Sequence, residues 1–368
     1  MTDFDWSVYD LETSWLPEQT IYVTRHGSQA YGTSRPDSDL DLRGIAVSPM
    51  RYYLGVGEGF EQEVIREPDD LTVYDIRKFL TLAKVANPNV LELLYTEPED
   101  HLVVHPVMRS LFDIRDTFLT QKVKHTFSGY SRAQMKRIRT HRRWLMDPPT
   151  TPPTRAEYDL PERTVIPADQ LAAAQAAVQK QIDQWSWHEM ENLEPALRRS
   201  LQDEFTRRLL EITQWSWEEI DDKVWFAASR AVGLDTNFIE LLDRERRYTG
   251  AQREWANYQR WKKERNPARA ALEAKHGYDT KHAMHLVRLA RMCREILTEG
   301  IVRVRRPDAE DLLTIRDGAW TYDQLVEFSD KQDAELDALL KTCSLPWGVD
   351  ERQISKTCME IILHFQGA

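Results

Sequence analysis

The most informative part of the sequence is Gly27-Ser-Gln-Ala-Tyr-Gly-Thr-Ser-Arg-Pro-Asp-Ser-Asp-Leu-Asp-Leu-Arg-Gly-Ile-Ala-Val47. Polar and apolar side chains alternate through Asp39, Leu40, Asp41 and Leu42, a pattern that is typical of a half-buried β-strand. Residues two apart on a strand point to one face, so the two aspartates stand side by side, about 7 Å apart at their backbones. The two leucines point the other way, into a core.

A Gly-Ser pair supplies the other half of a predicted site. Gly27 and Ser28 follow an extended apolar run, 21–24, and Asp39 stands eleven residues after Ser28. Glycine lets the backbone approach a phosphate closely, and free amide N–H groups with a hydroxyl can cradle its oxygens. Two neighbouring carboxylates repel each other unless a cation neutralises them, and Mg²⁺ commonly takes one or two carboxylates plus substrate phosphates. The pattern therefore predicts phosphoryl or nucleotidyl transfer. The alternative is an Asp-rich turn in which Asp39 serves as a cap.

These residues carry a resemblance to a known family. Gly-Ser followed about eleven residues later by Asp-x-Asp resembles the nucleotidyltransferase superfamily, which includes DNA polymerase beta. The longer pattern Gly27-Ser-x-Ala-Tyr-Gly-Thr-x-x-Pro-x-Ser-Asp-x-Asp-x-Arg-Gly44 is similar to one branch, the predicted nucleotidyltransferases sometimes linked to RNA repair. Four further stretches resemble that branch and extend the likeness from about residue 21 to 340: 87–92, 129–130, 144–149 and 277–285.

The resemblance implies a site with two Mg²⁺ ions (or Mn²⁺) held by Asp39, Asp41 and a third carboxylate on an adjacent strand. Residues 70–74 form the best candidate strand. Its first residue, Asp70, is the preferred third ligand and a candidate catalytic residue. Asp75 stands where an N-cap belongs, before a helical pattern over 76–84. The remaining alternatives for the third ligand are Asp69, Glu63 and Asp75.

Several basic residues are candidates for binding the nucleotide. Arg43 shares the Asp face by alternation and either contacts a triphosphate or forms a salt bridge to a neighbouring carboxylate. Lys281, His285 and Arg288 share one face of a predicted helix, next to His282. A zinc site at the two histidines lacks further ligands at suitable spacing. The cluster is expected to grip the triphosphate or shuttle a proton; otherwise it is a hydrogen-bonded core element.

Two predicted helices are candidates for RNA contact. The segment 132–143 holds six basic residues and no acidic one, and its RNA-binding candidates are Arg137, Arg142 and Arg143. In the helix predicted over 241–263, basic residues interleave with Tyr248, Trp255, Tyr258 and Trp261, as single-stranded nucleic-acid contact requires. Its candidates are Arg253, Arg260 and Lys262. The alternatives are a helix face paired with acids elsewhere for the first helix, and buried aromatics under a solvated basic face for the second.

The composition limits the classes of protein to which the chain can belong. The 368 residues are 30% charged and 41% hydrophobic with a net charge of −11, which is ordinary for a globular protein and argues against a general nucleic-acid coat protein. Three widely spaced cysteines indicate a reducing compartment. No signal-peptide pattern and no run near the ~20 apolar residues of a membrane helix are present, so we expect a cytoplasmic protein with no membrane partner. The oligomeric state stays open.

The sequence predicts an α+β fold, with a small mixed β-sheet nucleotidyltransferase core and a large all-helical remainder. The expected parts are a catalytic core (1–115), a helical domain (116–275) with a Pro-rich arm (147–167), and a C-terminal helical lobe (276–368). The prolines of the arm preclude a continuous helix and favour an extended segment packed on the surface.

The predicted function is Mg²⁺-dependent transfer of a nucleoside monophosphate from an NTP to an acceptor hydroxyl. The expected acceptor is an RNA end, tRNA-like, in RNA repair or modification. A second hypothesis keeps the chemistry and transfers AMP or another NMP to a protein or a small molecule, as in antitoxin-like or antibiotic-modifying relatives. A third is a non-catalytic nucleotide- or RNA-binding protein. The choice of NTP, template dependence and 5′ or 3′ addition are left open.

Overall fold

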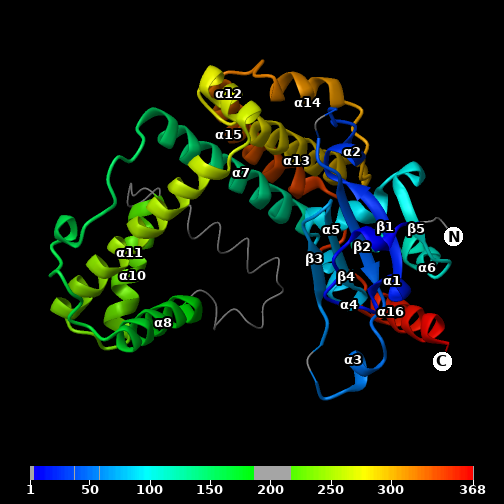
Figure 1. Ribbon diagram of the computed structural model, residues 1–368, viewed down its shortest axis with the longest axis horizontal. Helices are drawn as coiled ribbons and strands as arrows, with labels where there is room; N and C mark the ends of the chain where they lie inside the picture. Colours follow the sequence, from blue (N-terminus) through cyan, green and yellow to red (C-terminus); the bar gives the residue numbers. More distant parts are fainter. Residues whose placement is uncertain (1–3, 37, 58, 186–216, 368) are drawn as a thin grey trace. The chain divides into compact units, whose positions relative to one another are not determined.

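The computed structural model describes residues 4–36, 38–57, 59–185 and 217–367 (Figure 1). The chain divides into two compact units. Unit 1 is built from two separate segments, Met1–Met146 and Asn266–Ala368, and unit 2 is the inserted segment Asp147–Arg265. The three-part division expected from the sequence stays a prediction about domains; by their contacts, residues 116–146 and 276–368 lie in the same unit.

Unit 1 contains a five-stranded sheet with the order β3-β4-β2-β1-β5. Its strands are β1 (Thr20–His26), β2 (Asp41–Ala46), β3 (Gln62–Ile65), β4 (Asp70–Asp75) and β5 (His101–Val104). Strands β2 and β4 are parallel, whereas β1–β2, β1–β5 and β3–β4 are antiparallel. The sheet is therefore mixed and small, and the α+β prediction is confirmed.

Alternation along the strands gives the sheet two buried faces. Leu42 on β2 and Leu71 on β4 point to one face, where they pack against N-terminal residues such as Leu16. On the other face Ile45 joins a larger core with Phe79 and the other buried residues of the neighbouring helices. Asp41 and Asp70 precede Leu42 and Leu71 by one position, so both aspartates belong to this helix-covered face.

Helices supply the rest of unit 1. They are α1 (Leu16–Gln19), α2 (Gly27–Tyr31), α3 (Arg51–Leu54), α4 (Ile76–Lys84), α5 (Pro88–Leu91), α6 (Met108–Asp113), α7 (Lys122–Met146), α12 (Pro267–His276), α13 (Thr280–Glu299), α14 (Ala309–Arg316), α15 (Tyr322–Thr342) and α16 (Glu351–Gln366), with the short 3-10 helices η1 (Trp6–Val8), η2 (Glu92–Tyr95), η3 (Pro98–Asp100) and η4 (Arg115–Phe118). Figure 1 shows α13 lying along α7, and Leu286 and Val287 pack with Ile138 between them. Asp279 caps the start of α13 through the backbone N–H of His282.

Unit 2 is helical in its described part. It contains η5 (Arg155–Tyr158), α8 (Ala168–Trp185), α10 (Trp217–Ala231) and α11 (Thr236–Glu264), with a core that includes Val178, Trp225 and Leu242. The Pro-rich arm packs on α11 through Arg155, which forms a bidentate ion pair with the buried Glu245. The residues 186–216, which the predicted helical domain includes, lie outside the described residues. Within the described part of the chain, no helix combines the length and the apolar character that crossing a membrane requires.

Candidate functional site

Strand pairing brings two of the predicted carboxylates together. Asp41 is the first residue of β2 and lies opposite Asp70, the first residue of the parallel strand β4. Adjacent strands lie about 4.8 Å apart, so the two side chains leave the same face as neighbours. The backbone N–H of Asp70 donates to the carbonyl of Leu40 at 3.2 Å, which extends the pairing one residue beyond β2. Asp39 stands just before this point and is exposed.

The alternative candidates for a third carboxylate have other partners. Glu63 is buried and accepts the backbone N–H groups of Glu12 (2.8 Å) and Thr13 (3.0 Å). Asp69 accepts the Tyr9 hydroxyl at 2.9 Å. These contacts tie the N-terminal segment to the sheet and occupy both carboxylates.

Asp75 also has a structural role. It caps α4 through the backbone N–H of Arg77, as the sequence predicted, and accepts the hydroxyls of Ser48 (2.6 Å) and Tyr53 (2.9 Å). Among the four candidates, Asp70 is the one whose strand position is level with Asp41.

Gly27 lies directly against this carboxylate pair. The last residue of β1, His26, is paired with Asp41, and Gly27 follows it with φ +60° at the start of α2. A Cβ atom on Gly27 would lie 2.0 Å from Asp41 Oδ2. Both the positive φ and the missing space require glycine here. Gly27 of the Gly-Ser pair therefore lies against Asp41, whereas contact of Ser28 with phosphate stays a prediction.

Burial and neighbouring ionisable groups both act on the pKa of the Asp41 carboxylate. Burial raises its pKa, the positive charges of Arg43, His26 and Lys281 lower it, and the carboxylate of Asp70 raises it, with a net upward shift. A carboxylate with a raised pKa and a like-charged neighbour is one whose ionised form gains from a cation. Arg43 itself donates to the carbonyls of Leu42 and Asp70 at 2.6 and 2.7 Å.

Arg43 and Arg66 both lie 3.5 Å from carboxylate oxygens of Asp70. The salt-bridge alternative for Arg43 is therefore present in the structure, whereas its contact with a triphosphate stays a prediction.

Lys281, in the first turn of α13, interacts electrostatically with the same carboxylates. Burial lowers the pKa of Lys281, as do the positive charges of Arg269 and Arg316, while Asp39 and Asp41 raise it. The carboxylates and this cation are thus close enough to influence one another across the site. Burial, Arg288, His282, Lys281 and Arg269 all lower the pKa of His285, which keeps its imidazole neutral.

A buried network anchors α2 to α13. Glu92 is fully buried; its carboxylate accepts the Tyr31 hydroxyl at 2.7 Å and an Arg288 N–H at 2.6 Å, and lies 3.3 Å from His26. The Arg288 guanidinium also stacks over the Tyr31 ring at 3.7 Å. This is the hydrogen-bonded core arrangement that the sequence left open for the α13 cluster. The burial of Arg288 argues against a direct phosphate contact for this residue.

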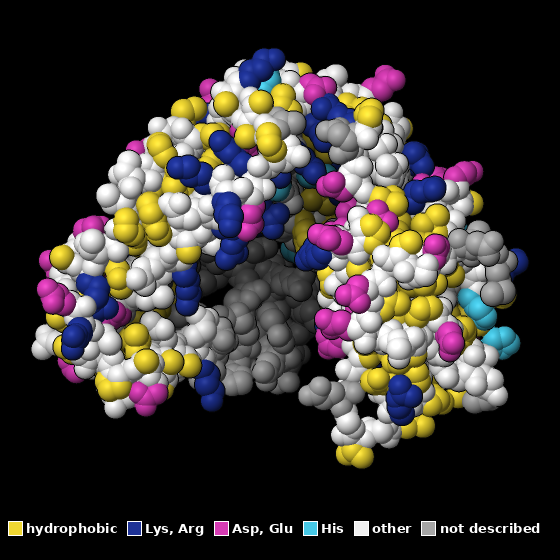
Figure 2. All heavy atoms as spheres, in the orientation of Figure 1, with side chains coloured by type: hydrophobic (Ala, Val, Ile, Leu, Met, Phe, Trp, Pro, Cys, Tyr) yellow, Lys and Arg dark blue, Asp and Glu magenta, His cyan; other side chains and the backbone are white. Residues whose placement is uncertain are grey.

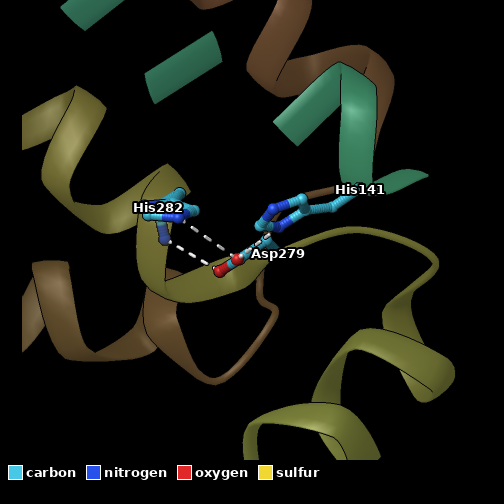
Figure 3. A group of neighbouring side chains, drawn as sticks. All are labelled: His141, Asp279 and His282. Carbon is cyan, nitrogen blue, oxygen red and sulfur yellow. Dashed lines mark hydrogen bonds and ion pairs between the residues drawn. The ribbon is translucent and has the colours of Figure 1, made fainter. Parts of the chain in front are cut away.

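Two further residues join His282 at the start of α13. His141 on α7 and His282 both approach Asp279, at 3.2 and 3.5 Å from its Oδ2 (Figure 3). In the described part of the chain, these three residues are the set that could hold a metal ion with histidine ligands. The sequence alone did not point to His141, because 138 residues separate it from Asp279. Asp279 was also missed, although it lies only three residues before His282.

The predicted RNA-binding residues occupy two helices in different units. On α7, Arg137 and Arg143 are exposed, whereas Arg142 donates to the Gly277 carbonyl at 2.8 Å and lies over the Tyr322 ring. On α11, Tyr258 is buried, which agrees with the alternative of buried aromatic side chains under a solvated basic face. Arg253, Arg260 and Lys262 on the same helix are exposed.

Acidic side chains gather on the surface of unit 1. Figure 2 shows them over the part of unit 1 where Figure 1 labels β3 and β4. RNA contact by the basic residues stays a prediction.

Glu92 and Tyr31 were not predicted as functional residues, although both lie in stretches that carry the family resemblance. Tyr31 follows the Gly-Ser pair, and Glu92 ends the Asn-Pro-Asn-Val-Leu-Glu stretch. Because both residues lie in stretches that resemble the family, the sequence did contain a signal that could have pointed to their contact. Arg269 and Arg316, which act on Lys281, lie in stretches with no such signal.

The first part of the chain is similar to known proteins. A family model described as "RNA repair pathway DNA polymerase beta family" matches residues 10–147. The "Uncharacterized 38.9 kDa protein in nrdC-mobD intergenic region" of Enterobacteria phage T4 is 33% identical over 129 residues, which cover 32% of this chain and 38% of that protein. The "Uncharacterized protein YcgL" of Bacillus subtilis (strain 168) is 36% identical over 81 residues, or 21% of this chain and 30% of that protein.

The matches are local: the chain spans well under half the length of both curated relatives. No solved structure matches it. The matched family segment, 10–147, contains the whole sheet, the Gly-Ser pair and all three candidate carboxylates. Residues 10–147 therefore match the RNA repair pathway DNA polymerase beta family, the branch of the nucleotidyltransferase superfamily that the sequence resembles.

Proposed function

We propose that this protein transfers a nucleoside monophosphate from an NTP to an acceptor hydroxyl, with an RNA end as the acceptor. The acceptor oxygen forms a bond to the α-phosphorus, the bond from that phosphorus to the bridging oxygen of pyrophosphate breaks, and pyrophosphate leaves. The hydroxyl proton passes to a carboxylate oxygen of Asp70. The observation that carries the proposal is the level pairing of Asp41 with Asp70, with Gly27 packed against Asp41.

The donor atoms at this position fit Mg²⁺ or Mn²⁺. Asp39, Asp41 and Asp70 offer hard carboxylate oxygens. Burial raises the pKa of Asp41 more than its cationic neighbours lower it, so a bound cation would stabilise the ionised carboxylate. When bound by these residues, the metal would neutralise phosphate charge and favour ionisation of the acceptor hydroxyl. Zinc would prefer nitrogen or sulfur donors, which these three residues do not offer.

The remaining residues of the proposed site bind and orient the nucleotide. In this proposal, Gly27 and Ser28 present backbone N–H groups and a hydroxyl to the phosphate oxygens. Lys281 approaches from α13, where the opposing carboxylates already act on its charge, and balances the negative charge of the leaving pyrophosphate. Arg288 acts indirectly, because its pair with Glu92 fixes the position of α13 against α2.

RNA is the proposed acceptor on two grounds. The matching family is described as belonging to an RNA repair pathway. Exposed basic residues on α7 and α11 also supply the positive charge that phosphate backbones require, in a chain whose net charge is −11. Arg137, Arg143, Arg253, Arg260 and Lys262 form this proposed RNA-binding set.

The test is a screen of α-³²P-labelled NTPs against RNA, protein and small-molecule acceptors with Mg²⁺ or Mn²⁺. We expect label on RNA, and at least a 100-fold loss in the Asp39→Asn/Asp41→Asn double variant, since the proposal assigns both carboxylates to the metal. Asp70→Asn should lose a similar factor. Asp69→Asn is the matched control and should stay active, because Asp69 bonds Tyr9 rather than the site.

Each outcome separates the hypotheses. Label on protein or a small molecule with none on RNA would replace the acceptor and keep the transfer chemistry. NTP binding without any labelled product, unchanged in the double variant, would support a non-catalytic nucleotide-binding protein instead.

A further inference from the structure

We propose a second metal site, distinct from the carboxylate pair, in which His141, Asp279 and His282 bind a divalent transition-metal ion of the Zn²⁺ type. His141 comes from α7, Asp279 is the N-cap of α13, and His282 lies in the first turn of α13. One ligand atom from each residue lies within 4.8 Å of the others. Figure 3 shows both imidazole rings directed at the one carboxylate.

Two of the three separations between the ligand atoms are close to those of a metal polyhedron, and all three are within 4.8 Å. A tetrahedral Zn²⁺ ion with ligand bonds of about 2.05 Å separates neighbouring ligand atoms by about 3.3 Å. His141 Nδ1 and His282 Nε2 lie 3.2 and 3.5 Å from Asp279 Oδ2, close to that separation. The first contact also serves as a hydrogen bond, but the second, at 3.5 Å, does not have hydrogen-bond geometry.

His282 has no hydrogen-bond partner for its ring in the described part of the chain. Its buried Nδ1 atom is without a partner, and Nε2 makes the long approach to Asp279 described above. A side chain that is 14% exposed normally satisfies its polar atoms, so the unpartnered Nδ1 atom and the long approach of Nε2 to Asp279 need an explanation. Burial lowers the pKa of His282 to about 3, which leaves the imidazole neutral, the form that binds metals.

The local charge admits a cation. Asp279 and Glu273 are both buried, with side chains 0% and 1% exposed, and they share the guanidinium of Arg269. Glu273 has a raised pKa because of its burial and its negative neighbour Asp279. Arg137 adds positive charge near His282, which disfavours an ion held by charge alone. Zn²⁺ bound largely through neutral nitrogen donors tolerates such surroundings better than Mg²⁺ does.

The ion would join two helices beside the transfer site. Because His141 lies on α7 and the other two ligands begin α13, bound metal would fix the start of α13, where Lys281 stands between Asp279 and His282. Three protein ligands leave a fourth position for water or an oxygen of a bound molecule.

Equilibrium dialysis of the full chain against Zn²⁺, followed by elemental analysis, tests the proposal. The measurement uses the Asp39→Asn/Asp41→Asn background, which removes the carboxylate pair as a competing site. We expect one Zn²⁺ per chain and roughly a 100-fold or greater loss of affinity in His141→Ala and in His282→Ala, because each removes a direct ligand. His364→Ala, on exposed His364 of α16, is the matched control and should bind like the parent.

Two further measurements guard against a folding artefact. Co²⁺ in place of Zn²⁺ should give the visible absorption of a tetrahedral nitrogen–oxygen site, and both histidine variants should lose it while keeping the parent circular dichroism. Arg269→Gln should tighten Zn²⁺ binding, because the guanidinium competes for Asp279 Oδ2. No Zn²⁺ bound at 100 μM, or equal binding by the parent and both histidine variants, would overturn the proposal. Zn²⁺ binding by His364→Ala that is as weak as binding by the two histidine variants would also overturn the proposal.

Discussion

Gly27 shows how one residue couples the two halves of the proposed site. Its φ of +60° favours glycine, and the space that a Cβ atom needs is occupied by Asp41 Oδ2. Any side chain at this position must displace the carboxylate. The requirement for glycine therefore belongs to the site as well as to the turn.

Gly27→Ala should strongly lower the transfer activity while leaving most of the protein's stability. The left-handed backbone costs about 1–2 kcal/mol for alanine, and the shifted carboxylate misplaces the proposed metal ligand. We expect at least a 100-fold fall in kcat/KM, measured by NTP labelling, with Tm lowered by only a few degrees.

Gly129→Ala is the control for this substitution. Gly129 lies within α7, and nothing lies within 4 Å of an added Cβ atom, so alanine should keep activity and raise stability by about 0.5–1 kcal/mol. Equal activity in the two variants would remove the steric argument for Gly27.

Glu92 carries a pH-dependent part of the stability. Burial by itself raises its pKa, but Arg288 and the contacts from His26 and Tyr31 outweigh burial and lower the pKa from 4.5 to about 2. In the unfolded chain the carboxyl takes up a proton at higher pH than in the folded protein. The stabilisation is thus fully present above pH 4.5 and is lost as the pH falls towards 2.

Glu92→Gln should lower the free energy of unfolding by about 3–5 kcal/mol at pH 7, because it leaves Arg288 buried without its partner charge. The difference from the parent should shrink as the pH falls from 5 to 3.5. Urea unfolding across this range measures it. Glu97→Gln, at an exposed position, is the control and should change stability by less than about 0.5 kcal/mol. A difference that stays constant with pH would contradict the assigned ionisation.

At the scale of elements, strand register decides which carboxylates meet. Because β2 and β4 are parallel and level, their first residues become neighbours. A slip of one residue would turn Asp70 to the opposite face and bring Leu71 towards the helices. The buried Leu42, Leu71 and Val73 on the other face hold this register.

Helix α11 offers an element-scale test of RNA binding. The triple variant Arg253→Gln/Arg260→Gln/Lys262→Gln removes three exposed positive charges. If these side chains neutralise phosphates, RNA affinity should fall in the variant. The slope of log K against log salt should also become shallower, by about 0.7 for each phosphate that is no longer neutralised. Filter binding at several salt concentrations measures both the affinity and the slope.

Lys180→Gln is the control for charge alone. Lys180 is exposed on α8 in the same unit, and its removal should leave the salt slope nearly unchanged. An unaltered slope in the triple variant would assign α11 a purely structural role.

In the whole molecule, the unit that carries the proposed transfer site is discontinuous in sequence. Unit 1 combines the sheet with α12 to α16, and unit 2 is inserted between α7 and α12. Each unit has its own apolar core among the described residues. The insertion is therefore expected to be separable from the proposed transfer site.

Replacing residues 147–265 with a Gly/Ser linker tests this organisation. Gly277 lies close to Met146, and α12 is about 15 Å long, so a linker of about 12 residues has ample reach. We expect the shortened chain to unfold cooperatively and to bind NTP as the parent does, with weaker RNA affinity. Calorimetry and NTP titration measure these properties; a chain that fails to fold would show that unit 2 is required for unit 1.

The sequence predicted the small mixed sheet because alternation and turn residues are local signals. Asp39, Asp41, Gly27 and Ser28 lie within fifteen residues of one another, and Asp70 opens a strand with its own apolar pattern. The pairing of Glu92 with Arg288 spans 196 residues, and no periodicity relates two such distant positions. For the same reason the predicted parts of the chain did not anticipate that 116–146 and 266–368 pack together.

Local sequence patterns were enough to predict the α+β class, a Gly-Ser pair before a strand with aspartates and the cap at Asp75, since each depends on residues close along the chain. The folded chain was needed to show that Asp70 lies level with Asp41, that Arg288 is buried against Glu92, and that His141 lies near Asp279 and His282. Strand register and helix packing bring those residues together. Both follow from burying apolar faces, whose pattern specifies what is buried but not which distant segment covers it.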